Sequence, residues 1–316
     1  MSPEPAGLRE LTDMKKYRIF QVDSFTRERL AGNPAGVVLD ADGLSDEMMQ
    51  RIAREMNNSE TAFLLPGGEG YDVHVRFFTP AREVPICGHA TIAAHYVRAL
   101  IGNLGSVRVL QKTGAGILPV DIAYENGDYR VAMTQGRIEI GPPLPAEVVR
   151  RIEGALGVPP EGRNESCPVA VASTGHGKVM VGIRDVAALH RLSPDMAALS
   201  GISGEIGVNG YYVFTLHPGE DALVHGRMFA PAIGVPEDPV TGNANGPLGA
   251  YLVQNGVVNP GDGTFSFTAV QGEAMKRPGR MVVEVDVKGG APVLVRIVGE
   301  AVVAFSTELE IGDPSA

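Results

Sequence analysis

Two stretches of this chain repeat each other in the same order, and this repeat restricts the fold more than any other feature. The segment RFFTPAREVP at residues 76–85 matches RMFAPAIGVP at residues 227–236, an offset of 151 (76 against 227). The same offset aligns Phe63 with Phe214. With three extra residues in the second copy, which raise the offset to 154 (87 against 241), CGHA at 87–90 aligns with TGNA at 241–244. A collinear series of this kind predicts a tandem duplication and two similar lobes related by an approximate two-fold axis.

The length of 316 residues accommodates two lobes of ordinary domain size, each with its own core. We expect lobes at residues 15–140 and 141–316, joined at the linker Gly141-Pro-Pro-Leu-Pro145, with residues 1–14 disordered. The last strand could return to the first lobe. Forty glycines and 23 prolines predict many tight turns and therefore β-rich lobes.

Each half also contains one stretch that is apolar on nearly every side, at residues 90–100 and 244–255. A helix of this composition must be buried along its length. The predicted fold class is therefore α+β, with two pseudo-symmetric lobes, each a mostly antiparallel, barrel-like sheet wrapped around a central apolar helix. The strands expected from alternation and turn residues are 17–23, 37–39, 61–65, 71–78, 106–112, 117–123, 128–134, 169–173, 179–183, 211–216, 222–229, 265–268, 281–287 and 293–305.

Residues typical of helix N-termini predict further helices. Ser45 is placed to cap a helix with apolar residues at four-residue spacing, and Leu192-Ser193-Pro194 resembles that start in the second half. A short helix is expected at residues 146–155.

Charge and cysteine usage exclude several functional classes. A net charge of −10 disfavours non-specific binding to nucleic acid or to anionic membranes. No apolar run reaches the roughly 20 residues that span a bilayer, and the first residues lack a secretory h-region. The two cysteines, Cys87 and Cys167, make no disulfide framework. We therefore expect a cytoplasmic protein.

The starts of the two apolar helices predict a ligand site. The first turn of a helix has unpaired N–H groups and a positive dipole end, which together favour an anion. Glycine at positions 88 and 242 allows a ligand to approach the backbone closely. If both helix starts face one cleft between the lobes, that cleft would hold a carboxylate.

Glu60 is the first of three candidate proton-handling residues. It precedes a strand of small and apolar residues, and its counterpart in the repeat is Tyr211, so the two halves differ here. A carboxyl group in a closed apolar cleft can act as an acid or base near neutral pH. A solvated glutamate at a strand end is the alternative.

His89 and Asp238 are the other two candidates. A histidine at a helix N-terminus is favoured in its neutral form and suits a hydrogen-bond donor, although many such histidines are only structural. Asp238 lies within the three extra residues of the second repeat, before Pro239, where aspartate is also a common turn residue.

These segments resemble the phenazine-biosynthesis PhzF-like isomerase family, which has the diaminopimelate-epimerase-like fold. The resemblance covers about residues 15–305 and is carried by GNPAGV at 32–37, SETAF at 59–63, FTP at 78–80, EVPICGHAT at 83–91 and EDPVTG at 237–242. It implies a homodimeric, cofactor-independent and metal-free isomerase that moves a proton on a small carboxylic acid, which is cyclic or an aromatic precursor.

By the same resemblance Glu60 is the catalytic acid/base, and His89 and Asp238 are its catalytic partners. The implied substrate-binding residues are Ser59, Gly88, Ala90, Gly242, Asn243 and Ala244. The family usually has serine after Gly242, so Asn243 is a departure that leaves the substrate contact there open.

Two other functions remain open. Cys87 and Thr241 occupy equivalent helix starts and could instead serve a dehydratase or a one-base epimerase of a hydroxy amino acid. A symmetric two-thiol racemase is disfavoured, because a threonine hydroxyl is too weakly acidic to replace a thiolate. A non-catalytic protein that binds a metabolite in the same cleft is the second alternative. A purely structural protein is the least favoured.

Overall fold

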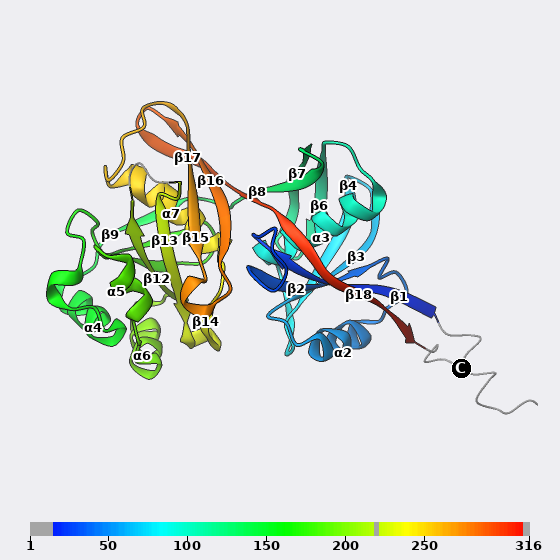
Figure 1. The fold of residues 1–316 in the computed structure, drawn as a ribbon, viewed down its shortest axis with the longest axis horizontal. Helices are drawn as coiled ribbons and strands as arrows, with labels where there is room; N and C mark the ends of the chain where they lie inside the picture. The colour runs from blue at the N-terminus through cyan, green and yellow to red at the C-terminus, as the bar shows by residue number, and fades with distance from the viewer. Residues whose placement is uncertain (1–14, 218–220, 312–316) are drawn as a thin grey trace, which may run out of the picture.

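The computed structural model describes residues 15–217 and 221–311, which form two lobes side by side (Figure 1). The disorder expected for residues 1–14 lies outside the described residues. Each lobe is a barrel-like, mostly antiparallel sheet around one central helix, as the repeat predicted. The predicted fold class is confirmed. Within the described residues, no helix has the length and apolarity needed to span a membrane.

The first lobe surrounds α3 (Gly88–Gly102), and α2 (Asp46–Met56) packs outside its sheet. Its strands pair in the order β18-β1-β2-β3-β4-β6-β7-β8, with β5 added beside β4. Only the β2–β3 and β4–β6 pairs among these are parallel. The strands are β1 (Lys15–Ser24), β2 (Asn33–Leu39), β3 (Thr61–Gly68), β4 (Tyr71–Phe78), β5 (Glu83–Val84), β6 (Val107–Thr113), β7 (Gly116–Glu125), β8 (Asp128–Thr134) and β18 (Ala301–Ile311).

The second lobe repeats this order around α7 (Gly242–Gln254). Its strands pair as β9-β10-β11-β12-β13-β15-β16-β17, with β14 beside β13 and the same two parallel positions, β11–β12 and β13–β15. The strands are β9 (Glu139–Pro143), β10 (Ala170–Ser173), β11 (Lys178–Gly182), β12 (Gly210–Leu216), β13 (Val224–Ala230), β14 (Val235–Asp238), β15 (Gly263–Gln271), β16 (Gly279–Lys288) and β17 (Ala291–Gly299). Three helices cover its outer side: α4 (Ala146–Leu156), α5 (Val186–Arg191) and α6 (Met196–Ile206). The short 3₁₀ turns are η1 (Pro160–Gly162), η2 (Pro231–Ile233) and η3 (Glu273–Met275).

The two halves of the chain exchange their last strands. β9, from the end of the first half, pairs with β10 of the second lobe, and β18 pairs with β1 of the first lobe. β8 and β17 pair with each other where the lobes join. Figure 1 shows β18 crossing from the second lobe to lie along β1. Both lobes are therefore completed by chain from the other half.

Two sequence predictions are wrong at this exchange. The expected single strand at 293–305 is two strands, because the chain leaves β17 for the other lobe at Glu300. There the Glu300 carboxylate accepts a hydrogen bond from Arg27 at 2.7 Å. The expected linker at 141–145 begins as part of β9, since its backbone pairs with Ala170 instead of running free.

The outer helices were predicted less well than the central ones. Ser45 caps α2 as predicted, accepting a hydrogen bond from the amide of Met48 at 3.2 Å. The expected start at Leu192-Ser193-Pro194 is wrong, because α6 begins at Met196 and Asp195 is its capping residue. α5 was not predicted, and it is too short to show a helical period.

The central helices are buried along their length, as their composition predicted. In α3 nearly every side chain from His89 to Ala99 is buried, and in α7 the same holds from Ala244 to Val253. α3 starts at Gly88 with no side-chain cap from Cys87, and α7 starts at Gly242 with none from Thr241. Both helix starts therefore keep backbone N–H groups without an intrahelical partner.

Candidate active site

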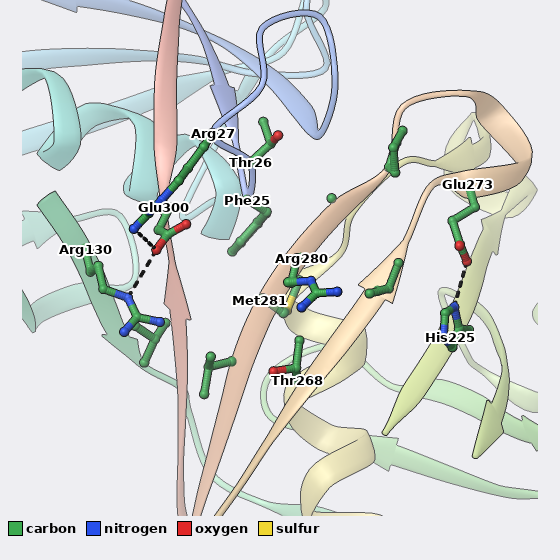
Figure 2. Close-up of a pocket in the computed structure, with 15 residues that line it drawn as sticks. Phe25, Thr26, Arg27, Arg130, His225, Thr268, Glu273, Arg280, Met281 and Glu300 are labelled. Carbon is green, nitrogen blue, oxygen red and sulfur yellow. Dashed lines mark hydrogen bonds and ion pairs between the residues drawn. The ribbon is translucent and has the colours of Figure 1, made fainter. Parts of the chain in front are cut away.

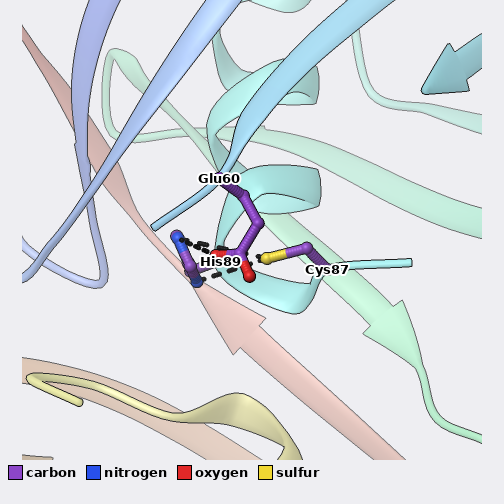
Figure 3. A group of neighbouring side chains, drawn as sticks. All are labelled: Glu60, Cys87 and His89. Carbon is purple, nitrogen blue, oxygen red and sulfur yellow. Dashed lines mark hydrogen bonds and ion pairs between the residues drawn. The ribbon is translucent and has the colours of Figure 1, made fainter. Parts of the chain in front are cut away.

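Glu60, Cys87 and His89 form a close cluster at the start of α3 (Figure 3). The Nε2 atom of His89 lies 3.5 Å from Oε2 of Glu60, and its Nδ1 atom lies 3.4 Å from Sγ of Cys87. The hydroxyl of Ser59 is 3.2 Å from the same Nε2. His89 is buried, whereas 21% of the Glu60 side chain is exposed. The histidine therefore connects a carboxyl group and a thiol, and the carboxyl group remains accessible.

The fold fixes the positions of Glu60 and His89 through backbone contacts. Glu60 immediately precedes β3, and its carbonyl accepts a hydrogen bond from the amide of Gly36 in the parallel strand β2 at 3.2 Å. His89 is the second residue of α3, and its carbonyl accepts a hydrogen bond from the buried hydroxyl of Ser24 at 2.8 Å. Both side chains are therefore presented from rigid elements, which is what an acid/base pair requires.

Asp238 reaches the first lobe from β14 of the second. Its Oδ1 accepts a hydrogen bond from Nδ2 of Asn33 at 2.8 Å, and its Oδ2 accepts one from the hydroxyl of Thr241. Burial raises the pKa of Asp238, and the charge of Glu60 acts in the same direction, whereas the charge of His89 lowers it. Asp238 is therefore close enough to both residues for their charges to act on it, and the structure brings the three predicted proton-handling residues together.

A buried network at the start of α7 holds the segment that carries Asp238. The side chain of Gln271 donates to the carbonyl of Asp238 at 2.7 Å and to the hydroxyl of Thr241 at 3.1 Å, and accepts from the amide of Thr241 at 3.1 Å. Asn245 donates to the same Gln271 oxygen at 3.0 Å and accepts from the hydroxyl of Tyr212 at 2.6 Å. Fully bonded polar networks of this kind rigidify a site.

The strand register corrects the expected counterpart of Glu60. Phe78 in β4 faces Thr61, and Phe229, its counterpart in β13, faces Tyr211. Tyr211 therefore corresponds to Thr61, and Gly210 corresponds to Glu60. Tyr211 is buried among the outer helices, where its hydroxyl donates to the carbonyl of Leu199 at 2.9 Å.

The register also corrects the position of Asp238. Phe77 faces Val84, and its counterpart Met228 faces Asp238. Asp238 therefore occupies the position of Val84 and is not one of the three extra residues, which lie before Glu237. The two carboxyl groups thus come from different positions of the repeat, one from each lobe, and this difference breaks the two-fold symmetry.

The predicted substrate-binding residues lie around these helix starts. A Cβ atom placed on Gly88 would meet nothing within 4 Å, and one on Gly242 would meet Phe25 and Ile297 at 3.7 Å. Packing therefore does not require glycine at either position. Asn243 is exposed and has non-helical backbone angles, which makes its amide side chain accessible. Ala90 and Ala244 are fully buried, and their side chains pack in the hydrophobic core.

The alternative catalytic residues are poorly suited to a thiol mechanism. Burial raises the pKa of the Cys87 thiol well above its ordinary value, and the charge of Glu60 raises it further, although the amide of Ala90 acts in the opposite direction. The Thr241 hydroxyl already donates to Asp238 and accepts from Gln271.

Glu60, Cys87 and His89 also offer three ligand atoms within 4.8 Å of one another, a set that could hold a metal ion such as Zn²⁺.

Sequence reasoning missed three residues beside Asp238: Asn33, Gln271 and Lys178. Asn33 lies in the GNPAGV segment that carries the family resemblance but was not assigned a role there, yet its buried amide bonds to the other lobe. Gln271 lies at the end of a strand, and no sequence feature marks it as a residue of the site. Lys178 immediately precedes the strand expected at 179–183, and a lysine next to so apolar a strand was the available signal.

A cavity of about 660 Å³ lies elsewhere and is not lined by the cluster (Figure 2). Its charged side chains are mostly paired with one another. Arg27 and Arg130 both face Glu300, at 2.7 and 3.5 Å, and His225 bonds to Glu273 at 2.8 Å. These groups satisfy one another, so we place the candidate site at Glu60, His89 and Asp238.

The duplicated helix-in-barrel architecture is the diaminopimelate-epimerase-like fold. Residues 22–307 match the model of the phenazine biosynthesis-like protein family, PhzC-PhzF. The chain belongs to this family, and it is an isomerase.

Individual relatives agree with this assignment. An uncharacterised isomerase of Clostridium acetobutylicum is 54% identical over 298 residues, which are 94% of this chain and 99% of the relative. Trans-2,3-dihydro-3-hydroxyanthranilate isomerase of Pseudomonas aeruginosa is 33% identical over 285 residues, 90% of this chain and 95% of the relative. The crystal structure of a PhzF-family phenazine biosynthesis protein of Bacillus anthracis superposes with a TM-score of 0.85, at 33% identity, covering 94% of this chain and all of that chain.

Proposed function

We propose that this isomerase moves a proton within a small, cyclic carboxylic acid, without a cofactor, and that Glu60 is the acid/base. The observation that carries the proposal is the contact of the accessible Glu60 carboxyl group with His89 at 3.5 Å, beside an aspartate from the other lobe. A general acid/base must lie within reach of both its substrate and its orienting partner, and Glu60 meets the second condition directly.

In the proposed reaction the Glu60 carboxylate removes a proton from a carbon atom next to a conjugated system. The C–H electron pair then delocalises along that system. Protonated Glu60 returns the proton to a different carbon, so one C–H bond breaks, another forms and the composition stays the same. Negative charge that develops on the substrate is stabilised by His89 and by the N–H groups at the start of α3.

The substrate class follows from the relative that acts on trans-2,3-dihydro-3-hydroxyanthranilate, a cyclic, conjugated carboxylic acid. We propose that the substrate shares these features and binds between the two lobes, at the helix starts.

The test is to incubate the enzyme with trans-2,3-dihydro-3-hydroxyanthranilate in D₂O and to follow the compound by proton NMR. A new isomer carrying deuterium is expected. Tight binding of an unchanged compound without exchange would instead favour the metabolite-binding alternative.

Gly88 provides a test of where the substrate binds. Because a Cβ at this position meets no atom and its backbone conformation is ordinary, Gly88→Ala should leave the melting temperature within about 1 °C of the wild type. If the substrate approaches the backbone of α3 as proposed, the added methyl group should raise KM at least about tenfold, since it displaces the ligand. Gly154→Ala, in the outer helix α4 and also without close neighbours, is the control. Unchanged KM in Gly88→Ala would move the substrate away from this helix start.

The thiol alternative is tested by Cys87. Its raised pKa keeps the thiol protonated at neutral pH, so iodoacetamide at pH 7.5 should modify it at least about tenfold more slowly than free cysteine. Cys87→Ser should retain turnover within about tenfold of the wild type. Rapid alkylation together with a severe loss of turnover in Cys87→Ser would support the dehydratase or one-base epimerase instead.

A further inference from the structure

Lys178 is a buried cation that the proposed reaction has not yet used. Only 3% of the residue is exposed. In the part of the chain that the structure describes, its ammonium group makes one hydrogen bond, to the carbonyl of His176 at 3.1 Å. An ammonium group has three donors, and burying its charge is costly unless a partner compensates. Lys178 is therefore poorly compensated by the described groups of the protein itself.

The register of β11 directs Lys178 toward the start of α7. Along this strand Met180 packs in the cluster around α7, whereas Val179 and Val181 pack against the outer helices. Since side chains alternate along a strand, Lys178 lies on the same side as Met180. Just before the strand, Thr174 donates to Gln135, whose amide donates to the carbonyl of Gly242 at 2.9 Å. The end of β11 that carries Lys178 is thus tied to the start of α7.

The repeat places Lys178 beside the second-lobe equivalent of Glu60. In the parallel pair β11–β12, Lys178 is opposite Gly210, which is the counterpart of Glu60. A Cβ at Gly210 would lie 2.4 Å from the carbonyl of Phe229, so no side chain can occupy that position. Where the first lobe has an acidic side chain, the second lobe therefore has none, and a lysine lies at the adjacent strand position.

The charges around the site explain why a cation is needed there. Burial lowers the pKa of Lys178 to about 8, and the charge of Asp238 opposes this shift, so the two groups interact. They nevertheless form no direct ion pair, because the Asp238 oxygens are bonded to Asn33 and Thr241. A carboxylate substrate that enters beside Glu60 and Asp238 is repelled by both carboxyl groups unless a cation receives it.

We propose that Lys178 forms the subsite for the substrate carboxylate in the second lobe, opposite the acid/base residue Glu60 in the first. This inference rests on the proposed function, and it adds the residue that selects anionic substrates. The substrate would span the two lobes, with its carboxylate on Lys178 and its reacting carbon at Glu60. A charged donor at this place would make Lys178 a specificity-determining residue.

The experiment measures equilibrium binding of two probes, anthranilate and its uncharged analogue anthranilamide, by titration calorimetry. Wild-type protein should bind anthranilate at least about tenfold more tightly than anthranilamide. Lys178→Met should weaken anthranilate binding by about tenfold or more, leave anthranilamide binding within about twofold, and so remove the preference. Lys178→Arg, which keeps the charge, should retain part of it. Lys288→Met, at an exposed lysine of the same lobe, is the matched control and should change nothing.

Thermal unfolding separates this role from a structural one. Removing an uncompensated buried charge should leave the melting temperature of Lys178→Met equal to or above that of the wild type. Wild-type protein that does not prefer anthranilate, or a Lys178→Met variant that loses affinity for both probes equally, would overturn the subsite.

The outcome is independent of the proton-transfer chemistry, because binding of these probes requires no turnover. If the subsite fails, Glu60→Gln would still abolish exchange. If the proposed reaction fails instead, Lys178 would still select anions.

Discussion

Replacing Glu60 by glutamine is expected to lower turnover of trans-2,3-dihydro-3-hydroxyanthranilate by about 10²- to 10⁴-fold, the usual contribution of a general acid/base. Glutamine keeps the shape of the side chain and can still face Nε2 of His89, which lies 3.5 Å from the carboxyl group. It cannot accept a proton from carbon. Chemistry should therefore fail while the site remains assembled.

The measurement pairs turnover with binding. Proton NMR in D₂O should show no deuterium in the compound recovered from Glu60→Gln, and calorimetry should show its dissociation constant within about threefold of the wild type. A residue that only shapes the site would change both quantities together. Glu55→Gln, on the exposed side of α2, is the matched control and should behave as the wild type. Wild-type turnover in Glu60→Gln would remove this residue from the mechanism.

The duplication made the overall fold predictable, because matched residues at a fixed offset require matched elements. The apolar stretches at 90–100 and 244–255 could only be buried helices, and the structure has α3 and α7 there. The sequence allowed for the return of β18 to the first lobe, but it did not predict the exchange of β9 or where each exchanged strand begins. Strand pairing between distant segments leaves no local pattern, so the sequence alone read 293–305 as one strand and 141–145 as a free linker.

The site was predicted only in part, for a related reason. Glu60, His89 and Asp238 stand in recognisable segments, and the structure brings them together. The repeat counterpart of Glu60 was misassigned by one residue, and that of Asp238 by the position of the insertion. Identical residues in two sequence segments do not determine which residues face each other in the hydrogen-bonded strands. The identical Val-Pro pairs at 84–85 and 235–236 misled the alignment, since Val84 in fact corresponds to Asp238.

Both lobes contain the same arginine–glutamate pair, but the pair in the second lobe is more buried and has more partners. Both repeats have an arginine that bonds a glutamate through two nitrogens and stacks on a phenylalanine, with Arg76 on Glu83 and Arg227 on Glu237. The Arg227 side chain is 9% exposed and that of Arg76 is 17%, but their glutamates differ more, at 15% and 43%. Arg227 also donates to the carbonyls of Leu189 and Leu192 at 3.0 and 2.9 Å, at the end of α5.

Arg227→Ala should therefore destabilise the protein by about 3–5 kcal/mol, because it leaves a half-buried carboxylate and two carbonyls of a helix end without a partner. Arg76→Ala should cost about 1–2 kcal/mol, since its partners Glu83 and Asp46 can be hydrated again. Urea denaturation followed by far-UV circular dichroism measures both. Arg227→Lys should not restore the loss, because an ammonium group cannot reproduce the two-nitrogen contact and both carbonyl bonds. Equal destabilisation by the two alanine variants would show that burial of the second-lobe pair contributes nothing beyond the contact that both repeats share.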